Sequence, residues 1–148
     1  MSDQLNPDFS VVSGDYVMTK GWRISLGDEF NRRIEDGSMV LWKPELTFWI
    51  NVWNNERGAS PDELLQEILV RANPERTAEK TTRGDATIHL TYELAEDDAE
   101  RPDSASGSRA SINGFIIAAP GYVQVSAYAD TPEDHAMACR IIDSISTC

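Results

Sequence analysis

The residues of this chain with the most evident potential for chemistry are its two histidines and two cysteines. His135 and Cys139 lie four residues apart in a predicted helix, a spacing that places both side chains on one helix face. A Cys–His pair can form a nucleophile. The histidines show none of the HxH, HxxxH or HExxH spacings of metal ligands, and His89 falls on the polar side of a predicted strand. We therefore expect two surface histidines, and a Cys139 that packs as a small residue in the buried stripe of its helix.

The sequence motifs of the commonest enzyme classes are missing. The chain contains no GxGxxG, GxxxxGK[ST], GxSxG or CxxC sequence. Its carboxylates fall mostly in predicted first turns of helices or in the segment 93–103, whose AEDDAERPD run does not match the alternating ligands of a calcium loop. The sequence therefore predicts no catalytic residues, no metal site and no cofactor, and we expect a protein that is not an enzyme.

The most specific feature of the sequence is the stretch 40–55, VLWKPELTFWINVWNN, which holds three of the four tryptophans. At the period of a β-strand, the part that begins at Leu46 splits into an aliphatic face and a face that carries indoles. The two sets are Leu46, Phe48, Ile50 and Val52 on one side, and Thr47, Trp49, Asn51 and Trp53 on the other. An exposed strand face is normally polar, so the indoles need either a cover within the chain or a partner.

A turn at Pro44-Glu45 extends this two-faced pattern to the preceding strand. A two-residue hairpin loop there fixes which residues of the two strands lie opposite each other. The expected pairs are Trp42–Thr47, Leu41–Phe48, Val40–Trp49 and Met39–Ile50. The pairing therefore adds Trp42 to the side of the sheet that carries Trp49 and Trp53, which we call the indole face.

An arginine must share the indole face. Adjacent residues of a strand point to opposite sides, so one of Arg32 and Arg33 lies there in either register. A guanidinium over an indole contributes about 0.5–2 kcal/mol, depending on desolvation. Either a helix or the other half of the molecule covers this face as a second core, or the face is a binding surface, since Trp and Arg are enriched at interface hot spots. We expect at least partial cover, and the candidate partner-binding residues are Trp42, Trp49, Trp53, Arg33 and Asn51.

The net charge of −12, from 13 Lys and Arg against 25 Asp and Glu, favours a basic protein partner and disfavours nucleic acid, whose phosphates it repels. The same charge also keeps a protein in solution. The amino terminus lacks the basic and apolar regions of a secretory signal, and no apolar run approaches the ~18–20 residues that span a membrane. Because the two cysteines do not resemble a disulfide framework, we expect a cytoplasmic protein that does not bind membranes.

The predicted elements alternate between groups of strands and single helices. The expected strands cover 16–26, 30–34, 39–43, 46–54, 87–94, 111–119 and 122–129. Ser60-Pro61-Asp62-Glu63 begins one helix with a serine cap, a proline and a capping-box glutamate, and Thr131-Pro132 begins the second in the same way. The sequence therefore predicts an α+β fold, a mostly antiparallel β-sheet with two helices packed on it in an α/β/α sandwich.

The chain is expected to form a single domain over residues 1–148. A domain of this length buries about 68–70% of the surface that its unfolded chain exposes. Its hydrophobic content of 41% and charged content of 26% are typical of a soluble globular protein. Residues 1–13 are predicted to form a polar lead-in, and 95–109, AEDDAERPDSASGSR, a mobile acidic loop.

The order of these elements resembles the PsbP-like α/β/α sandwich. GWRISLGDEF opens the pattern, a hairpin leads to LTFWINVWNN, the helix SPDELLQEIL follows, and strands and a closing helix complete it over residues 14–147. The PsbP-like group includes DcrB-type proteins, some of which serve as chaperones for effectors of type VI secretion. The chain is also similar to small uncharacterised bacterial proteins with the pattern RRIEDGSMVLW…LTFWINVW. These resemblances imply a binding role without catalytic residues.

Taken together, the residues and the resemblance favour a non-enzymatic protein-binding module. It would serve as an immunity protein that plugs a basic toxin, or as an adaptor or chaperone linked to a bacterial secretion system. Acidic groups would steer the partner, and Trp49, Trp53 and an arginine would anchor it. One alternative is a small-molecule-binding protein or enzyme with a pocket between sheet and helix. Another is a homo-oligomer in which the indole face pairs with itself.

Overall fold

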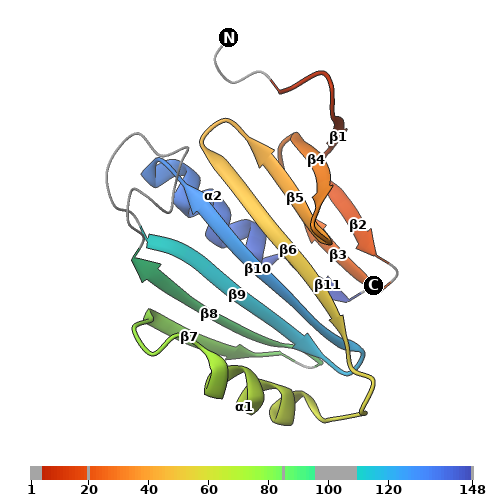
Figure 1. Ribbon diagram of the computed structural model, residues 1–148, viewed down its shortest axis with the longest axis vertical. Coiled ribbons are helices and arrows are strands. Elements are labelled where there is room, and N and C mark those ends of the chain that lie inside the picture. Colours follow the sequence, from red (N-terminus) through yellow and green to blue (C-terminus); the bar gives the residue numbers. More distant parts are fainter. Residues whose placement is uncertain (1–4, 20, 85, 96–109, 148) are drawn as a thin grey trace.

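The computed structural model describes residues 5–19, 21–84, 86–95 and 110–147. The described residues form two helices and eleven strands (Figure 1). The strands form one large sheet and one small sheet. The helices are α1 (Pro61–Arg71) and α2 (Pro132–Asp143). The strands are β1 (Ser10–Val12), β2 (Asp15–Thr19), β3 (Trp22–Ser25), β4 (Phe30–Glu35), β5 (Ser38–Lys43), β6 (Leu46–Asn54), β7 (Thr77–Arg83), β8 (Ile88–Ala95), β9 (Ala110–Ala118), β10 (Gly121–Ala129) and β11 (Ser146–Thr147). The predicted α+β class, with a mostly antiparallel sheet and two helices, is confirmed.

The large sheet is built from two antiparallel meanders that meet in its middle. Its strand order is β1-β4-β5-β6-β10-β9-β8-β7, so the first four strands come from the N-terminal half of the chain and the last four from the C-terminal half. The two halves join where β6 pairs with β10, from Leu46 opposite Ala129 to Asn54 opposite Gly121. This pairing makes both halves parts of one continuous sheet.

The β5–β6 hairpin has the register that the sequence predicts. Trp42 lies opposite Thr47 and Val40 opposite Trp49, with the two aliphatic pairs between them. The chain turns at Pro44-Glu45, where Glu45 has a positive φ of 73°. The preceding β4–β5 hairpin turns at Asp36-Gly37, and both residues have positive φ, as a two-residue hairpin loop demands.

Both helices begin with the caps that their sequences predict. The Ser60 hydroxyl accepts a hydrogen bond from the Glu63 N–H at 3.1 Å, and the Glu63 carboxylate accepts one from the Ser60 N–H at 2.9 Å. At the start of α2, the Thr131 hydroxyl oxygen accepts the Asp134 N–H at 3.1 Å. In the described part of the chain, neither helix has the length and apolar character needed to cross a membrane.

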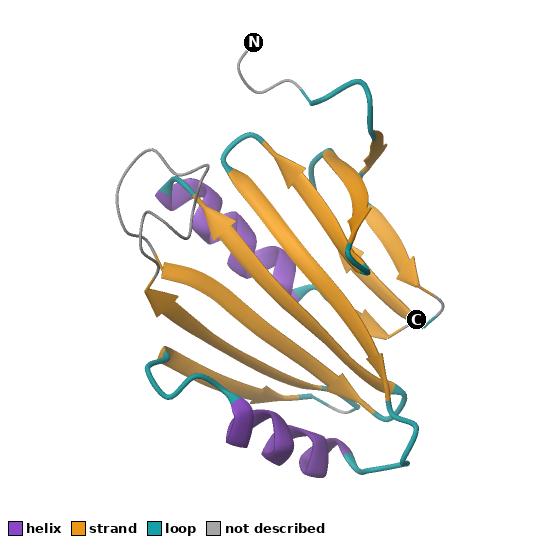
Figure 2. Ribbon diagram, viewed as in Figure 1, coloured by secondary structure: helices purple, strands orange, loops and turns teal. Residues whose placement is uncertain are grey.

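The two sides of the large sheet carry two separate hydrophobic cores. On one side, α2 and the small sheet β11-β3-β2 pack on the central strands and form the larger core. On the other side, α1 packs on β8 and β9 and forms the smaller core (Figure 2). The aliphatic face of β6 belongs to the larger core, because Leu46, Phe48 and Ile50 are buried there. α1 does not extend over the side of β4, β5 and β6 that faces away from the larger core.

Two predicted segments differ from the structure, and one strand was not predicted. Residues 10–12 of the predicted lead-in form β1, which pairs with β4. The predicted strand 16–26 is instead the hairpin of β2 and β3, which belongs to the small sheet. The polar segment 77–83 forms the edge strand β7, although it lacks the apolar alternation from which strands are predicted. Of the predicted acidic loop, residues 96–109 lie outside the described residues, and Ala95 ends β8.

The close packing of α2 on the sheet depends on Gly114 in β9. A Cβ atom at this position would lie 2.9 Å from Ile142 Cγ2 and 3.1 Å from Val125 Cγ1. Gly114→Ala is therefore expected to lower the free energy of unfolding by about 1–3 kcal/mol, as overpacking of a core does. Urea denaturation measures the change. Gly84→Ala is the control, because its Cβ would meet nothing closer than Thr87 Oγ1 at 3.5 Å. Equal stability of the two variants would contradict the expectation.

Candidate functional site

All five predicted partner-binding residues lie on one side of the large sheet. Trp42 extends from β5, Trp49, Asn51 and Trp53 from β6, and Arg33 from β4. On the neighbouring strand β10, Tyr122 lies opposite Trp53 and Ser126 opposite Trp49. The indole face therefore extends over four strands, β4, β5, β6 and β10.

Arg33 is held between two indoles. Its guanidinium carbon lies 4.5 Å from the centroid of the Trp42 ring and 5.7 Å from that of Trp49. The Arg33 Nε–H donates to Glu35 Oε1 at 2.9 Å, which fixes the orientation of the guanidinium. Val40 lies opposite both Arg33 and Trp49 and is fully buried. Because the Arg33 side chain is 30% exposed, its cation–π contacts are expected to contribute about 1 kcal/mol.

Arg32, the alternative to Arg33, points to the opposite side of the sheet. Its Nε atom is buried and has no hydrogen-bond partner among the described residues. Of these two arginines, Arg33 therefore supplies the guanidinium of the indole face.

Trp53 is the most exposed tryptophan, with 49% of its surface accessible. Its indole Nε1–H donates to Gln124 Oε1 at 3.3 Å. Its ring centroid lies 6.4 Å from that of Tyr122, which in turn lies 6.1 Å from Phe115 in the smaller core. A series of ring contacts therefore connects the exposed indole to the core under α1 and holds it in one orientation.

Trp42 is partly covered by the N-terminal segment. The Phe9 ring meets the Trp42 ring edge to face, with centroids 5.0 Å apart. This segment is held by Asn31 of β4, a fully buried residue whose Oδ1 accepts the Asn6 N–H at 2.7 Å and whose Nδ2 donates to the Asn6 carbonyl at 2.9 Å. Among the described residues, the cover of the indole face is therefore partial, and it comes from a phenylalanine and an arginine, not from a helix.

Several polar side chains of the indole face bind one another. The Ser38 hydroxyl donates to Asn51 Oδ1 at 3.0 Å, and the Ser126 hydroxyl donates to Asn113 Oδ1 at 2.8 Å. With Gln124 bonded to Trp53, much of the hydrogen-bonding capacity of the face is satisfied within the sheet. The face is therefore a firm aromatic surface, suited to bury area against a partner by shape and aromatic contact.

The rim of the indole face is acidic. Asp36 in the β4–β5 turn, Glu45 in the β5–β6 turn and Glu56 after β6 are exposed, and none forms an ion pair with another described residue. Of the nearby cations, Arg33 pairs with Glu35, and Lys43 lies 3.3 Å from Asp28. Negative charge therefore dominates both ends of the hairpin that carries the indoles.

His135 and Cys139 do meet on α2, with Sγ and Nδ1 4.0 Å apart, and His135 Nε2 lies 3.7 Å from Glu93 Oε1. However, burial raises the pKa of the Cys139 thiol, and the charges of Glu93 and Asp143 raise it further. A nucleophilic cysteine requires the opposite shift. Among the described residues, no group of three or more His, Cys, Asp or Glu side chains is placed to hold a metal ion.

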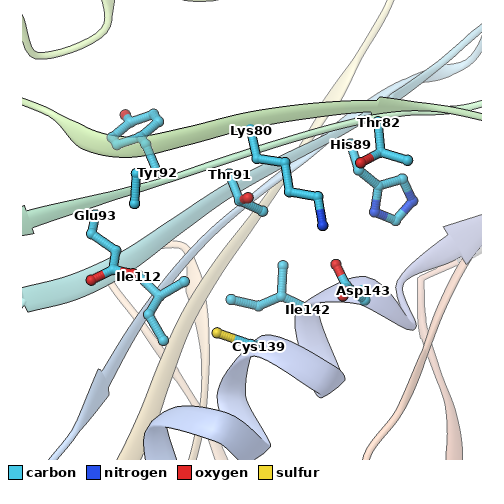
Figure 3. A pocket seen from close by; sticks show the side chains of 11 residues that line it. Lys80, Thr82, His89, Thr91, Tyr92, Glu93, Ile112, Cys139, Ile142 and Asp143 are labelled. Atoms are coloured by element: carbon cyan, nitrogen blue, oxygen red, sulfur yellow. The ribbon is translucent and has the colours of Figure 1, made fainter.

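A pocket of about 210 Å³ lies on the other side of the sheet, between β7, β8 and α2 (Figure 3). It is lined by Ala78, Lys80, Thr82, His89, Thr91, Tyr92, Glu93, Ile112, Cys139, Ile142 and Asp143. Sequence reasoning singled out His89 and Cys139 separately but did not bring them together. The pocket was not predicted because β7 was not predicted as a strand. Its residues are exposed on both sides and show no hydrophobic pattern.

No protein-family model matches this chain, and no curated protein matches it.

The anchoring role of Asn31 gives a first test of this site. Asn31→Ala is expected to lower the free energy of unfolding by about 1–3 kcal/mol, because it removes the two hydrogen bonds that hold the Asn6 backbone to β4. It should also release Phe9, so that acrylamide quenches tryptophan fluorescence more strongly. Asn54→Ala, at the exposed end of β6, is the control. Unchanged stability and quenching in Asn31→Ala would contradict the assignment.

The environment of Cys139 gives a second test. In a Cys148→Ser variant, Cys139 is the single thiol. Since its pKa is raised, less thiolate is present at pH 8, and iodoacetamide should alkylate it more slowly than free cysteine, whose pKa is about 8.5. Removing one raising charge by Glu93→Gln should lower the pKa and speed the reaction, whereas Glu133→Gln should not. Faster alkylation than free cysteine would identify an activated nucleophile instead.

Proposed function

We propose that this protein is a non-enzymatic, cytoplasmic protein-binding module that binds a basic partner protein through its indole face. The observation that carries the proposal is the partly exposed aromatic surface over β5, β6 and β10, with Arg33 of β4 fixed between two indoles and no helix of the described chain above it. The few residues that dominate the binding energy of protein interfaces are enriched in Trp, Tyr and Arg. A fixed arrangement loses little side-chain entropy on binding.

The acidic rim defines the class of partner. Asp36, Glu45 and Glu56 flank the indole face without ion pairs to other described residues, and the chain carries a net charge of −12. Opposite charge on a partner increases the association rate, and aromatic burial then slows dissociation. A partner with a basic rim around an apolar centre would match this surface.

Two biological roles fit such a module. An immunity protein would use the acidic rim to neutralise a basic toxin, and an adaptor or chaperone would present or protect a secreted effector. The resemblance to the PsbP-like sandwich and to DcrB-type proteins supports the second role. A toxin gene or a secretion gene beside this gene would distinguish the two.

Substitution of the exposed and partly exposed tryptophans tests the proposed binding surface directly. A partner captured from the native host should be purified and titrated against the full chain by calorimetry. Trp53→Ala and Trp49→Ala are each expected to weaken binding by at least about 2 kcal/mol, a hot-spot effect. Val70→Ala is the matched control, since Val70 is an exposed apolar residue on α1, away from the indole face.

Three outcomes would count against the proposal. Unchanged affinity in both tryptophan variants, with their folds intact by circular dichroism, would show that the partner binds elsewhere. If the affinity does not fall as the salt concentration rises, the charges of the acidic rim do not contribute to binding. A stable dimer in light scattering, lost in Trp53→Ala, would show that the indole face pairs with itself.

The pocket between β7, β8 and α2 favours the second candidate function, a small-molecule-binding protein. Its volume is small compared with the roughly 300–1,000 Å³ of common ligand pockets, so only a small ligand would fit.

A further inference from the structure

The pocket between β7, β8 and α2 has a different character from the indole face. On the indole face, Asn51, Gln124 and Asn113 have hydrogen-bond partners within the sheet. In the pocket, none of the side chains of Lys80, Thr82, His89, Thr91 and Asp143 forms a hydrogen bond or an ion pair with another described residue. Polar side chains that converge on one hollow without binding one another are available to a ligand.

A β-bulge directs Lys80 into this pocket. Thr77 lies opposite Glu93, but Lys80 lies opposite Thr91, so β7 has one more residue than β8 in this stretch. Without that residue, Lys80 would lie opposite Leu90 and point toward the core under α1. The bulge also places Ala78, which lines the pocket, at a φ of 53°, a conformation that costs energy for a residue other than glycine. Bulges at sheet edges often re-aim a side chain in this way next to a functional site.

Charges of both signs line the pocket, and none of them pairs with another within the lining, although Glu93 Oε1 lies 3.7 Å from His135 Nε2 on α2. Lys80 points from β7 toward α2, with Glu93 to one side and His89 and Asp143 to the other (Figure 3). Lys80 forms no ion pair with either carboxylate, although all three line the same pocket. A ligand with a single negative charge would meet two carboxylates, and one with a single positive charge would meet the ammonium group. A ligand that carries both charges would satisfy both sides.

The uncharged residues of the lining and the volume of the pocket indicate the size and polarity of the ligand. Ile112 and Ile142 supply aliphatic surface beside the charged groups, and the hydroxyls of Thr82 and Thr91 add hydrogen-bonding groups. The volume of about 210 Å³ lies below the roughly 300–1,000 Å³ of common ligand pockets. It therefore fits a molecule of about ten non-hydrogen atoms or fewer.

We propose that this pocket binds a small zwitterion of the amino-acid type, with its carboxylate at Lys80, its ammonium group at Glu93 and a short aliphatic side chain against Ile112 and Ile142. This site lies on the opposite side of the sheet from the indole face. The inference therefore does not depend on the partner-binding function, and either can fail alone.

The test compares three probes of nearly equal shape on the full chain at pH 7. L-leucine carries both charges, 3-methylbutanoate only the negative charge and 3-methylbutylamine only the positive charge. In NMR titrations, leucine is expected to shift the backbone amides of His89, Thr91 and Cys139 at concentrations up to about 10 mM. Each analogue with a single charge should bind about tenfold more weakly, because it makes only one of the two charge contacts.

Substitutions of Lys80 and Glu93 test whether these two side chains bind the two charges of the ligand. Lys80→Met and Glu93→Gln should each weaken leucine binding about tenfold, which corresponds to about 1.4 kcal/mol. Arg83→Met is the matched control, since Arg83 is a cation of the same strand that pairs with Asp62 at the start of α1. Binding of 3-methylbutanoate or the amine as tightly as leucine would overturn the zwitterion assignment. No amide shift with any probe, or equal binding by Lys80→Met, would overturn the site itself.

Discussion

The structure depends above all on the pairing of β6 with β10. These are two of the longest strands, and their register from Leu46–Ala129 to Asn54–Gly121 is the only link between the two meanders of the described sheet. Because side chains alternate along a strand, this register also decides which side each residue faces. A slip of one residue would move Trp49 and Trp53 into the larger core and expose Phe48 and Ile50. The aliphatic side of β6 thus fixes the position of the indole side.

The two sides of the sheet offer surfaces of different kinds. On the indole face, hydrogen bonds between side chains and the stacking of Arg33 satisfy polar groups and leave aromatic area exposed. Such a surface gains energy mainly by excluding water against a complementary shape. In the pocket, charges of opposite sign are held apart on β7 and β8, so a ligand there would gain energy mainly by completing charge pairs. The proposals of a protein partner and of a small zwitterion follow from this difference.

The sequence allowed prediction of the parts that are specified locally. The β5–β6 register followed from strand alternation and the Pro44-Glu45 turn, and both helix starts followed from their capping residues. The parts that were missed depend on distant contacts. β7 is polar along its whole length and is a strand because β8 pairs with it, while the bulge that aims Lys80 leaves no hydrophobic pattern. The partial cover of Trp42 depends on Asn31, whose partners lie 21–25 residues away in the chain. The PsbP-like arrangement stays a prediction.

The unequal size of the two cores implies a stepwise loss of structure. Among the described residues, 21 buried side chains form the core beneath α2, whereas eight form the core beneath α1. Detachment of α1 is therefore expected to require less free energy than global unfolding. When α1 detaches, Leu90 and Phe115 become accessible beside Tyr122 and Trp53, so the aromatic surface widens toward the β7 edge. Binding of a partner that contacts the widened surface would be linked to this fluctuation, and its apparent affinity would then depend on how tightly α1 is held.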